Sequence, residues 1–298
     1  MNNQTPEREK LARELAALRA GGMSYSQIGR MHGMTMDAAK GLIYHHERKG
    51  KPKEFQVIDL GKPLELVGNY IVCGDAHVPA LDWDFAHLVS RLAEKKGVDN
   101  IAIAGDLLDG QMFSSFAKSS RPVAWAQERD AARVWFQDLL MTFSTITILM
   151  GNHDLRLIKW AEGELDEQDI FGMIMANPKI TVSGWSWCTI TSDSIPWHIT
   201  HPASFSSNQL TVAADIALNY QMNVVSFHEH KLAKGFDRFG RYVVINGGML
   251  ADGKKLEYYN KADKRAGKMI TGFVSIIDGE GEAYGAIPGF TNWRRVLQ

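Results

Sequence analysis

The sequence predicts an α/β domain preceded by a small, basic, all-α domain. Three apolar runs, at residues 70–73, 101–104 and 146–150, each end in a glycine followed by Asp or Asn. Continuous apolar runs without alternation are typical of strands that are covered on both faces. Patterns with helical spacing lie between these runs, and such alternation favours a mainly parallel sheet flanked by helices. Because ligands bind at the carboxyl ends of the strands in such sheets, we expect the polar residues after the runs to form a site.

The front of the chain shows helical spacing only. We expect helices near residues 6–19, 25–32 and 36–47, with Thr35 as the N-cap of the third. The short second helix, the turn at Gly33 and the third helix resemble a helix-turn-helix unit. Up to Glu54 there are ten Lys and Arg against six Asp and Glu, so this end is basic.

The predicted helix-turn-helix unit has two interpretations. If it binds DNA, Lys40 and Tyr44 are expected to face the groove, and Arg48 and Lys49 to contact phosphates. The alternative is a protein-interaction or dimerisation element, which leaves a homo-oligomer open. The predicted domains are residues 1–54, including a basic linker, and residues 55–298.

The larger domain is expected to alternate strands and helices and to end rich in strands. A hairpin through Asp278-Gly279-Glu280-Gly281 is predicted between its last two strands. We expect strands near residues 69–74, 99–105, 145–150, 181–191, 196–200, 223–227, 242–245, 269–277 and 283–286, and helices near 82–96, 123–143 and 209–219, with helical stretches between 155 and 175.

Composition is that of a globular protein of 298 residues with a formal net charge of −1, which argues against a protein that coats nucleic acid along its whole length. Cys73 and Cys188 are the two cysteines, so no disulfide framework is expected, and a reducing cytoplasm fits best. The sequence shows neither an apolar leader nor an apolar run long enough to span a membrane, so we expect no membrane partner.

Oxygen and nitrogen donors gather at the ends of the predicted strands. A single Asp or His there is more often a turn residue than a ligand, but the joint pattern favours a metal site. Mixed donors of this kind suit Mn²⁺, Fe or Zn²⁺ rather than metals that select thiolates. The candidates are Asp75, His77, Asp106, Asn152, His153, His201, His228 and His230.

These motifs resemble the calcineurin-like metallophosphoesterase family over residues 68–250. The matching blocks are Asp75-x-His77, Gly105-Asp106-x-x-Asp109, Gly151-Asn152-His153-Asp154, His201 and His228-x-His230, in the order of the family. The resemblance implies a two-sheet αββα sandwich with two divalent metal ions. Mn²⁺ is the expected metal, with Fe, Zn²⁺ or Ni as alternatives.

The resemblance also implies roles for the site residues. Asp106 would bridge both ions. His153 would protonate the leaving group, and Asp109 would orient that histidine. By the same carry-over, Asp75, His77 and His230 would hold one ion, and Asn152, His201 and His228 the other.

Several positions stay open at this stage. Asp154 and Arg156 are expected either to cap and solvate the next helix or, for Arg156, to contact a phosphate. His198 is the alternative to His201 as a ligand. Phe227 stands where the family usually has glycine, so it is expected to form a bulky wall of the site.

Substrate contacts are expected from two further stretches. The polar loop 112–121, which carries two aromatics and Arg121, either touches a phosphate or stacks a base, or is a plain surface loop. The basic, tyrosine-containing run 254–268 follows the last metal motif closely.

The leading interpretation is a metal-dependent phosphodiesterase that acts on nucleic acid, nuclease-like and of phage or bacterial type. The alternatives are a phosphatase or phosphodiesterase of small nucleotides and, from another class, a non-catalytic DNA- or protein-binding scaffold. The scaffold would be marked by missing ligands. None of the motif ligands is missing here.

Overall fold

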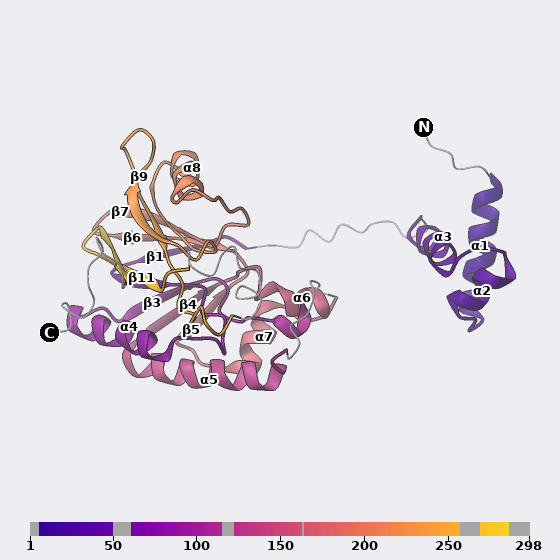
Figure 1. The fold of residues 1–298 in the computed structure, drawn as a ribbon, viewed down its shortest axis with the longest axis horizontal. Helices are drawn as coiled ribbons and strands as arrows, with labels where there is room; N and C mark the ends of the chain where they lie inside the picture. The colour runs from indigo at the N-terminus through magenta and orange to yellow at the C-terminus, as the bar shows by residue number, and fades with distance from the viewer. Residues whose placement is uncertain (1–5, 50–60, 115–121, 163, 257–268, 286–298) are drawn as a thin grey trace. The chain divides into compact units, whose positions relative to one another are not determined.

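A computed structural model of the chain describes residues 6–49, 61–114, 122–162, 164–256 and 269–285. The chain divides into two compact units, residues 1–60 and 61–298, and each is described by itself (Figure 1). The division expected between residues 54 and 55 stays a prediction, because residues 50–60 lie outside the described part.

The first unit contains α1 (Pro6–Ala20), α2 (Tyr25–Met31) and α3 (Met36–Lys49). The hydroxyl of Thr35 accepts the Ala38 N–H at 3.2 Å, as expected of the N-cap of α3. The helices pack through four fully buried side chains. Three helices are therefore present at the expected places, while their identification as a helix-turn-helix unit stays a prediction. The four core residues are Leu15, Ile28, Ala39 and Ile43.

The second unit opens with strands and helices in alternation. Its first half contains β1 (Leu64–Val67), β2 (Tyr70–Cys73), α4 (Trp83–Lys96), β3 (Asn100–Ala104), η1 (Gln111–Phe113, a 3₁₀ turn), α5 (Trp125–Thr142), β4 (Thr145–Leu149), α6 (Leu155–Trp160) and α7 (Glu167–Ile174). Its second half contains β5 (Ile180–Ser183), β6 (Trp187–Ser192), β7 (Ile195–Thr200), α8 (Thr211–Tyr220), β8 (Asn223–Ser226), β9 (Leu232–Phe236), β10 (Val243–Gly247), β11 (Gly272–Ile277) and β12 (Glu280–Gly285).

The strands form two six-stranded sheets. The first sheet has the order β12-β11-β2-β3-β4-β5, and the second sheet has the order β1-β6-β7-β8-β10-β9. Strands β2, β3, β4 and β5 run parallel to one another in the first sheet. Strands β7, β8 and β10 run parallel in the second. The carboxyl ends of several strands therefore meet at one edge of each sheet.

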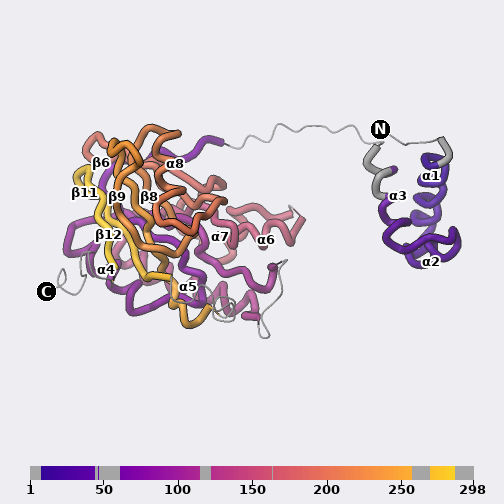
Figure 2. Tube along the Cα trace, turned by 45° about the horizontal axis from the view of Figure 1, so that its top comes forward, coloured from indigo at the N-terminus to yellow at the C-terminus, as the bar shows by residue number. Residues whose placement is uncertain are grey.

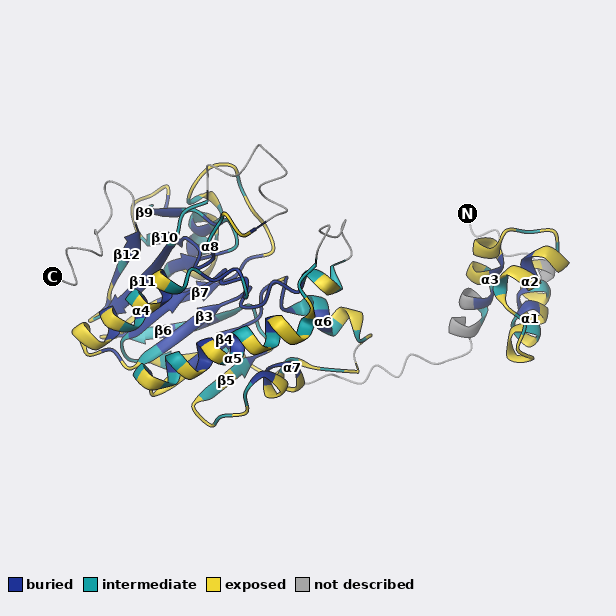
Figure 3. Cartoon of the chain, turned by 60° about the horizontal axis from the view of Figure 1, so that its bottom comes forward, coloured by how far each residue is buried: buried dark blue, intermediate teal, exposed yellow. Residues whose placement is uncertain are grey.

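The two sheets stack face to face with helices outside them. In Figures 1 and 2, α8 lies on one side of the pair, and α4 and α5 lie on the other. Alternate residues of β2 divide between the layers: Ile71 and Cys73 face the helices, while Tyr70 and Val72 pack between the sheets. Figure 3 shows buried strands flanked by helices with one exposed face. The predicted αββα sandwich with an all-α front is confirmed.

Two details of the prediction were wrong. The run 181–191 is not one strand, because the chain leaves the first sheet after β5 and enters the second at β6. The short strands β1 and β9 were not expected, and both lie at sheet edges. Among the described helices, none is both long and apolar enough to cross a membrane.

Candidate active site

The candidate ligands lie in loops at the carboxyl ends of strands from both sheets. In the first sheet, the residues after β2, β3 and β4 supply two Asp-containing motifs and the Asn-His pair. In the second sheet, His201 follows β7, and the two other histidines follow β8. Parallel pairing brings these strand ends together, so residues up to 155 positions apart in sequence meet at one place.

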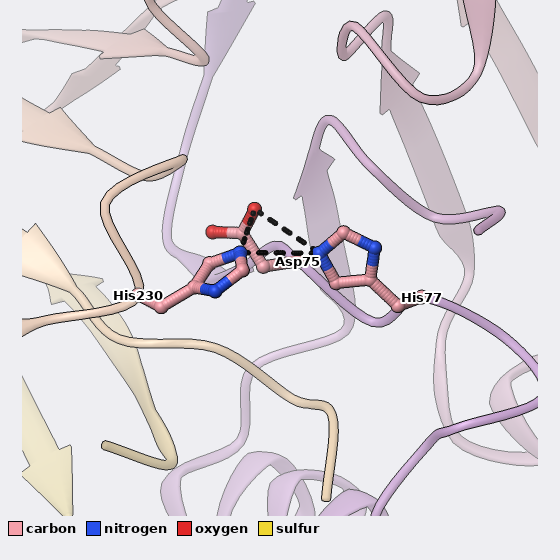
Figure 4. A group of neighbouring side chains, drawn as sticks. All are labelled: Asp75, His77 and His230. Atoms are coloured by element: carbon pink, nitrogen blue, oxygen red, sulfur yellow. Dashed lines mark hydrogen bonds and ion pairs between the residues drawn. The ribbon is translucent and has the colours of Figure 1, made fainter. Parts of the chain in front are cut away.

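Asp75, His77 and His230 form a buried group of three donors (Figure 4). The Nε2 atoms of His77 and His230 lie 3.1 Å apart. The Nε2 atom of His230 lies 3.3 Å from Oδ1 of Asp75, and that of His77 lies 3.9 Å from it. Within the described residues, this carboxylate oxygen is buried without a hydrogen-bond partner. Two imidazole nitrogens and an unsatisfied carboxylate oxygen directed at one point fit a divalent cation.

The other oxygen of Asp75 joins the two sheets. Its Oδ2 atom accepts the backbone N–H of His228 at 2.8 Å. Burial by itself would raise the pKa of Asp75, but His230 and His201 lower it below its ordinary value. The carboxylate is therefore held charged and oriented toward the histidines of the second sheet.

Asp106, His201 and His228 form a second group of donors, and Asn152 adjoins it. The Nε2 atom of His201 lies 3.3 Å from Oδ2 of Asp106 and 3.2 Å from Oδ1 of Asn152. The Nδ1 atom of His201 faces the carbonyl of Ala104 at 3.1 Å. If Nδ1–H donates to that carbonyl, Nε2 is left with a lone pair for a metal ion. Because His228 is half-buried and Asn152 is exposed, this group opens to solvent.

Asp106 lies between the second group and the His153 loop. Its Oδ1 atom accepts the backbone N–H of His153 at 2.7 Å, while Oδ2 faces His201. Burial would raise the pKa of Asp106, but His201 and His153 hold it well below its ordinary range. Burial likewise would lower the pKa of His201, but the Asp106 carboxylate raises it to about 9. A divalent cation would therefore take the place of a proton on His201.

His153 and Asp109 form a dyad beside the candidate metal ligands. The Nδ1 atom of His153 lies 2.9 Å from the carbonyl oxygen of Asp109 and 3.1 Å from its Oδ1. Asp109 Oδ1 also lies 3.5 Å from Nδ1 of His77, so it faces both rings. Burial would raise the pKa of Asp109, but hydrogen bonds from His153 and His77 hold it below its ordinary range. The dyad has the geometry of an imidazole oriented by a carboxylate.

Arg156 closes the other side of the His153 ring. One of its terminal nitrogens lies 2.8 Å from His153 Nε2, and the other donates to the carbonyl of Asp109 at 2.8 Å. Because a guanidinium can only donate, Nε2 of His153 accepts here and its Nδ1 carries the proton. Arg156 therefore lies at the dyad rather than extended into solvent from α6.

One expectation was that Asp154 caps or solvates α6, but its side chain does neither. It is buried, and its two oxygens accept the backbone N–H groups of Leu108 and Gly151, each at 2.9 Å. It therefore ties the Asp106 loop to the Asn152 loop. Burial raises the pKa of Asp154 to about 7.

Of the seven residues that the resemblance assigns to the metal ions, five have a left-handed backbone. Their φ angles lie between 43° and 78°, a region that costs a non-glycine residue about 1–2 kcal/mol. Two glycines allow the ligands to approach: a Cβ on Gly105 would lie 2.4 Å from the His201 ring, and one on Gly151 would lie 2.2 Å from Asp106. The ligand loops are therefore tightly constrained. The five residues are Asp75, His77, Asp106, His228 and His230.

Two open positions are settled by packing. His198 lies on the far face of the second sheet, where it stacks on Tyr220 with ring centroids 4.1 Å apart, so His201 and not His198 faces the other donors. The expectation that Phe227 forms a wall of the site was wrong. Its ring is fully buried between Gly74 and Gly247, where glycine leaves room for it.

Two buried carboxylates near the site were missed. Glu128 on α5 accepts the Gly110 N–H at 2.7 Å and so supports the turn after Asp109; burial raises its pKa to about 8. Glu229 accepts the Ser206 N–H and the Asn246 side-chain N–H, each at 2.7 Å. Its position between two histidine ligands was a signal that sequence reading could have used. Glu128 had no such signal, because its pattern is that of a surface helix.

The remaining predicted contacts are only partly described. Lys40 is exposed on α3. Arg121 lies outside the described residues, as do 257–268 of the basic run. The side chains of Tyr44, Arg48 and Lys49 are also outside the described part, and their contacts stay predictions.

Comparison with known proteins gives one family. The profile of the calcineurin-like phosphoesterases matches residues 68–239, more than half of the chain. No curated protein matches the sequence.

Several solved structures are similar. A predicted phosphoesterase from Streptococcus pneumoniae is 14% identical, with 75% of this chain and 94% of that chain covered and a TM-score of 0.35. The phosphoesterase Yfce from E. coli is 16% identical, with 70% and 87% covered and a TM-score of 0.39. A hypothetical protein from Pyrococcus horikoshii is 8% identical, with 78% and 91% covered and a TM-score of 0.45.

Proposed function

This chain belongs to the calcineurin-like phosphoesterase family, and we propose that it is a nuclease-like phosphodiesterase that uses two divalent metal ions. The observation that carries the proposal is the presence of two neighbouring donor groups, Asp75–His77–His230 and Asp106–His201–His228, each of which combines loops from both sheets. They are linked at close range, because Nδ1 of His201 lies 3.9 Å from Oδ1 of Asp75.

In this proposal each donor group holds one ion. Asp75, His77 and His230 would hold the first, and Asn152, His201 and His228 would hold the second, with Asp106 contributing to both. When bound, two such ions lower the pKa of a water between them and stabilise negative charge on the phosphoryl group. Mn²⁺ is the proposed metal, since oxygen and imidazole donors suit it; Fe, Zn²⁺ and Ni remain alternatives.

His153 is the proposed general acid. It would give a proton from Nε2 to the oxygen of the leaving group, while Asp109 holds the Nδ1 side of the ring. Nε2 accepts from Arg156 in the structure, so the guanidinium has to leave before that atom can carry a proton. A phosphoryl oxygen offers the departing guanidinium a charged acceptor. We therefore assign Arg156 to the substrate phosphate.

Nucleic acid is the proposed substrate because of the basic front of the chain. Residues 1–54 carry a net formal charge of +4, and the exposed Lys40 and Arg30 lie on α3 and α2. Basic side chains supply the sequence-independent part of DNA binding. Small nucleotides are the alternative substrate, and Arg121 is proposed as a further phosphate contact in either case.

The test compares three substrates with added Mn²⁺: bis-p-nitrophenyl phosphate, p-nitrophenyl phosphate and linear DNA. Asp106→Asn is run beside the wild type, and Asp215→Asn, an exposed Asp on α8, is the matched control. We expect diester and DNA cleavage that is lost in Asp106→Asn and kept in Asp215→Asn. Cleavage of the monoester alone would replace the proposal with a phosphatase. Absence of Mn²⁺-dependent turnover on all three substrates would reject the nuclease-like proposal.

A further inference from the structure

Three aromatic side chains form a cluster that the proposed chemistry does not use, which we call the aromatic shelf: Phe113, Trp125 and Trp160. The ring of Phe113 lies 5.3 Å from that of Trp160 and 6.0 Å from that of Trp125, measured between centroids. Phe113 and Trp125 are partly buried against the core. Trp160, in contrast, is 65% exposed although it packs on Phe113. The shelf therefore presents an indole to solvent on a buried aromatic base.

Two of the three shelf residues, Phe113 and Trp160, lie on the two elements that leave the acid dyad, and Trp125 begins α5. The turn η1, which ends at Phe113, begins two residues after Asp109, and α6, which ends at Trp160, begins two residues after His153. A Cβ on Gly110 would lie 2.9 Å from the carbonyl oxygen of His153, so the two elements are in close contact where they start. Packing between Phe113 and Trp160 then keeps their far ends together.

Arg156 lies between the dyad and the shelf. Residues four apart on a helix are neighbours on one face, so Arg156 and Trp160 share a face of α6 and are about one turn apart. The guanidinium of Arg156 is at Nε2 of His153. The proposed acid therefore lies just before α6, and one face of α6 presents the Arg156 cation and then the exposed indole of Trp160.

We propose that the aromatic shelf binds the base of the nucleoside that leaves during hydrolysis. The inference rests on the proposed function, in which His153 protonates the leaving oxygen. A leaving group at His153 that extends past Arg156 reaches the shelf next. Planar bases stack on exposed aromatic side chains without regard to sequence, whereas a bare sugar offers no such face. The shelf thus favours nucleotides over simple alkyl phosphodiesters.

An exposed aromatic elsewhere provides a matched control. Phe239 is 62% exposed in the turn between β9 and β10, and Arg238 and Arg241 lie over its ring at 5.1 and 4.9 Å. It thus also combines an exposed ring with a cation, but on an element that does not start at the dyad. Phe239→Ala should leave the handling of the leaving nucleoside unchanged.

The experiment uses the full chain with Mn²⁺ and three dinucleotide substrates. These are dithymidine monophosphate and two analogues that each lack one base. The product without phosphate identifies the leaving nucleoside. For wild type we expect kcat/KM to be about tenfold lower when the leaving side lacks its base, which corresponds to about 1.4 kcal/mol. In Trp160→Ala we expect that difference to disappear. Trp160→Phe should retain part of it, and Phe239→Ala all of it.

A second measurement follows binding without turnover. Dithymidine monophosphate is added in the presence of EDTA, and quenching of tryptophan fluorescence is recorded for wild type and Trp160→Phe. Quenching that depends on Trp160, together with no turnover of any substrate, would support the shelf and reject the proposed phosphodiesterase. Turnover with equal base dependence in wild type and Trp160→Ala would overturn the shelf and leave the phosphodiesterase standing.

Discussion

The two sheets bring different chemistry to the candidate site. Among the described residues, the first sheet supplies the carboxylates Asp75, Asp106 and Asp109, together with the rings of His77 and His153, whereas the second supplies imidazoles alone. The carboxylates and the proposed acid are therefore placed by adjacent parallel strands, while the second sheet closes the candidate site with nitrogen donors. We therefore expect changes in the first sheet to damage the chemistry, and changes in the second to weaken metal binding.

The largest effect should follow from Asp106→Asn in the first sheet. Because both donor groups depend on this carboxylate in our proposal, kcat/KM for bis-p-nitrophenyl phosphate should fall by on the order of 10⁴ or more. Millimolar Mn²⁺ should not restore it. Full rescue of turnover by added Mn²⁺ would contradict the expectation that changes in the first sheet damage the chemistry and not only metal binding. Initial rates across a Mn²⁺ titration measure this.

His153→Ala should come next, with a loss of ~10²–10⁴ in kcat. Because His153 is assigned to proton transfer, the metal content measured by mass spectrometry should match wild type. A good leaving group such as p-nitrophenolate should reduce the loss, since it departs without a proton. Loss of bound metal in this variant would show that His153 is a ligand instead.

The ion pair between His201 and Asp106, which joins the two sheets, predicts that the stability of the metal-free protein depends on pH. The pKa of His201 is raised from 6.5 to about 9, so its stabilising contribution is complete below pH 6.5 and is lost as pH rises to 9. The difference corresponds to about 3 kcal/mol. The partner Asp106 has a lowered pKa, so its contribution is lost only as pH falls below 3.8. The unfolding free energy in EDTA should therefore decrease from pH 6.5 to 9.

Glu128 should add to this decrease of the unfolding free energy with rising pH. A variant of Glu128 therefore provides a control for the contribution of His201. Burial raises its pKa from 4.5 to about 8, so the cost of ionising it grows as pH rises through that range. Glu128→Gln keeps an acceptor for the Gly110 N–H but removes the charge. The variant should therefore gain stability relative to wild type at pH 9, on the order of a few kcal/mol, and differ little at pH 5. Urea unfolding at the two pH values measures both slopes.

His228→Ala should have a smaller effect that added metal reverses. His228 is half-buried at the open group, so its loss should weaken metal affinity at least ~10-fold while high Mn²⁺ restores turnover. His198→Phe in the same sheet should change neither metal affinity nor turnover, because His198 stacks on Tyr220 away from the donors. If high Mn²⁺ did not restore turnover in His228→Ala, the expected difference between changes in the first sheet and changes in the second would be contradicted.

The smallest effect on chemistry should come from deleting residues 1–54. Turnover of bis-p-nitrophenyl phosphate should change less than about twofold, because the candidate donors all lie in the second unit. DNA affinity at low salt should fall about tenfold, with a shallower salt dependence. Unaltered affinity across salt would reject the DNA role of the front of the chain.

The sequence indicated which polar residues gather at the candidate site because they follow apolar strands as a joint pattern, while their role as metal ligands stays a prediction. His198 stayed open from the sequence as the alternative to His201, and the structure places His201 among the donors. Burial of Asp154 and Glu128 could not be predicted, since each depends on backbone N–H groups from another loop. The crossover between β5 and β6 was missed because local sequence does not encode which sheet a strand joins.

The left-handed backbone at the ligands bears on how this protein can diverge or be redesigned. A lineage that loses catalysis but keeps the fold would retain five positions with a constrained backbone, although the metal binding proposed for them would no longer be needed. Glycine, and to a lesser extent Asn and Asp, adopts that backbone at little cost, whereas β-branched residues do not. Inactive descendants, or binding scaffolds engineered from this chain, should therefore accumulate Gly or Asn at His77, His228 and His230, and should keep Asp or change to Gly or Asn at Asp75 and Asp106.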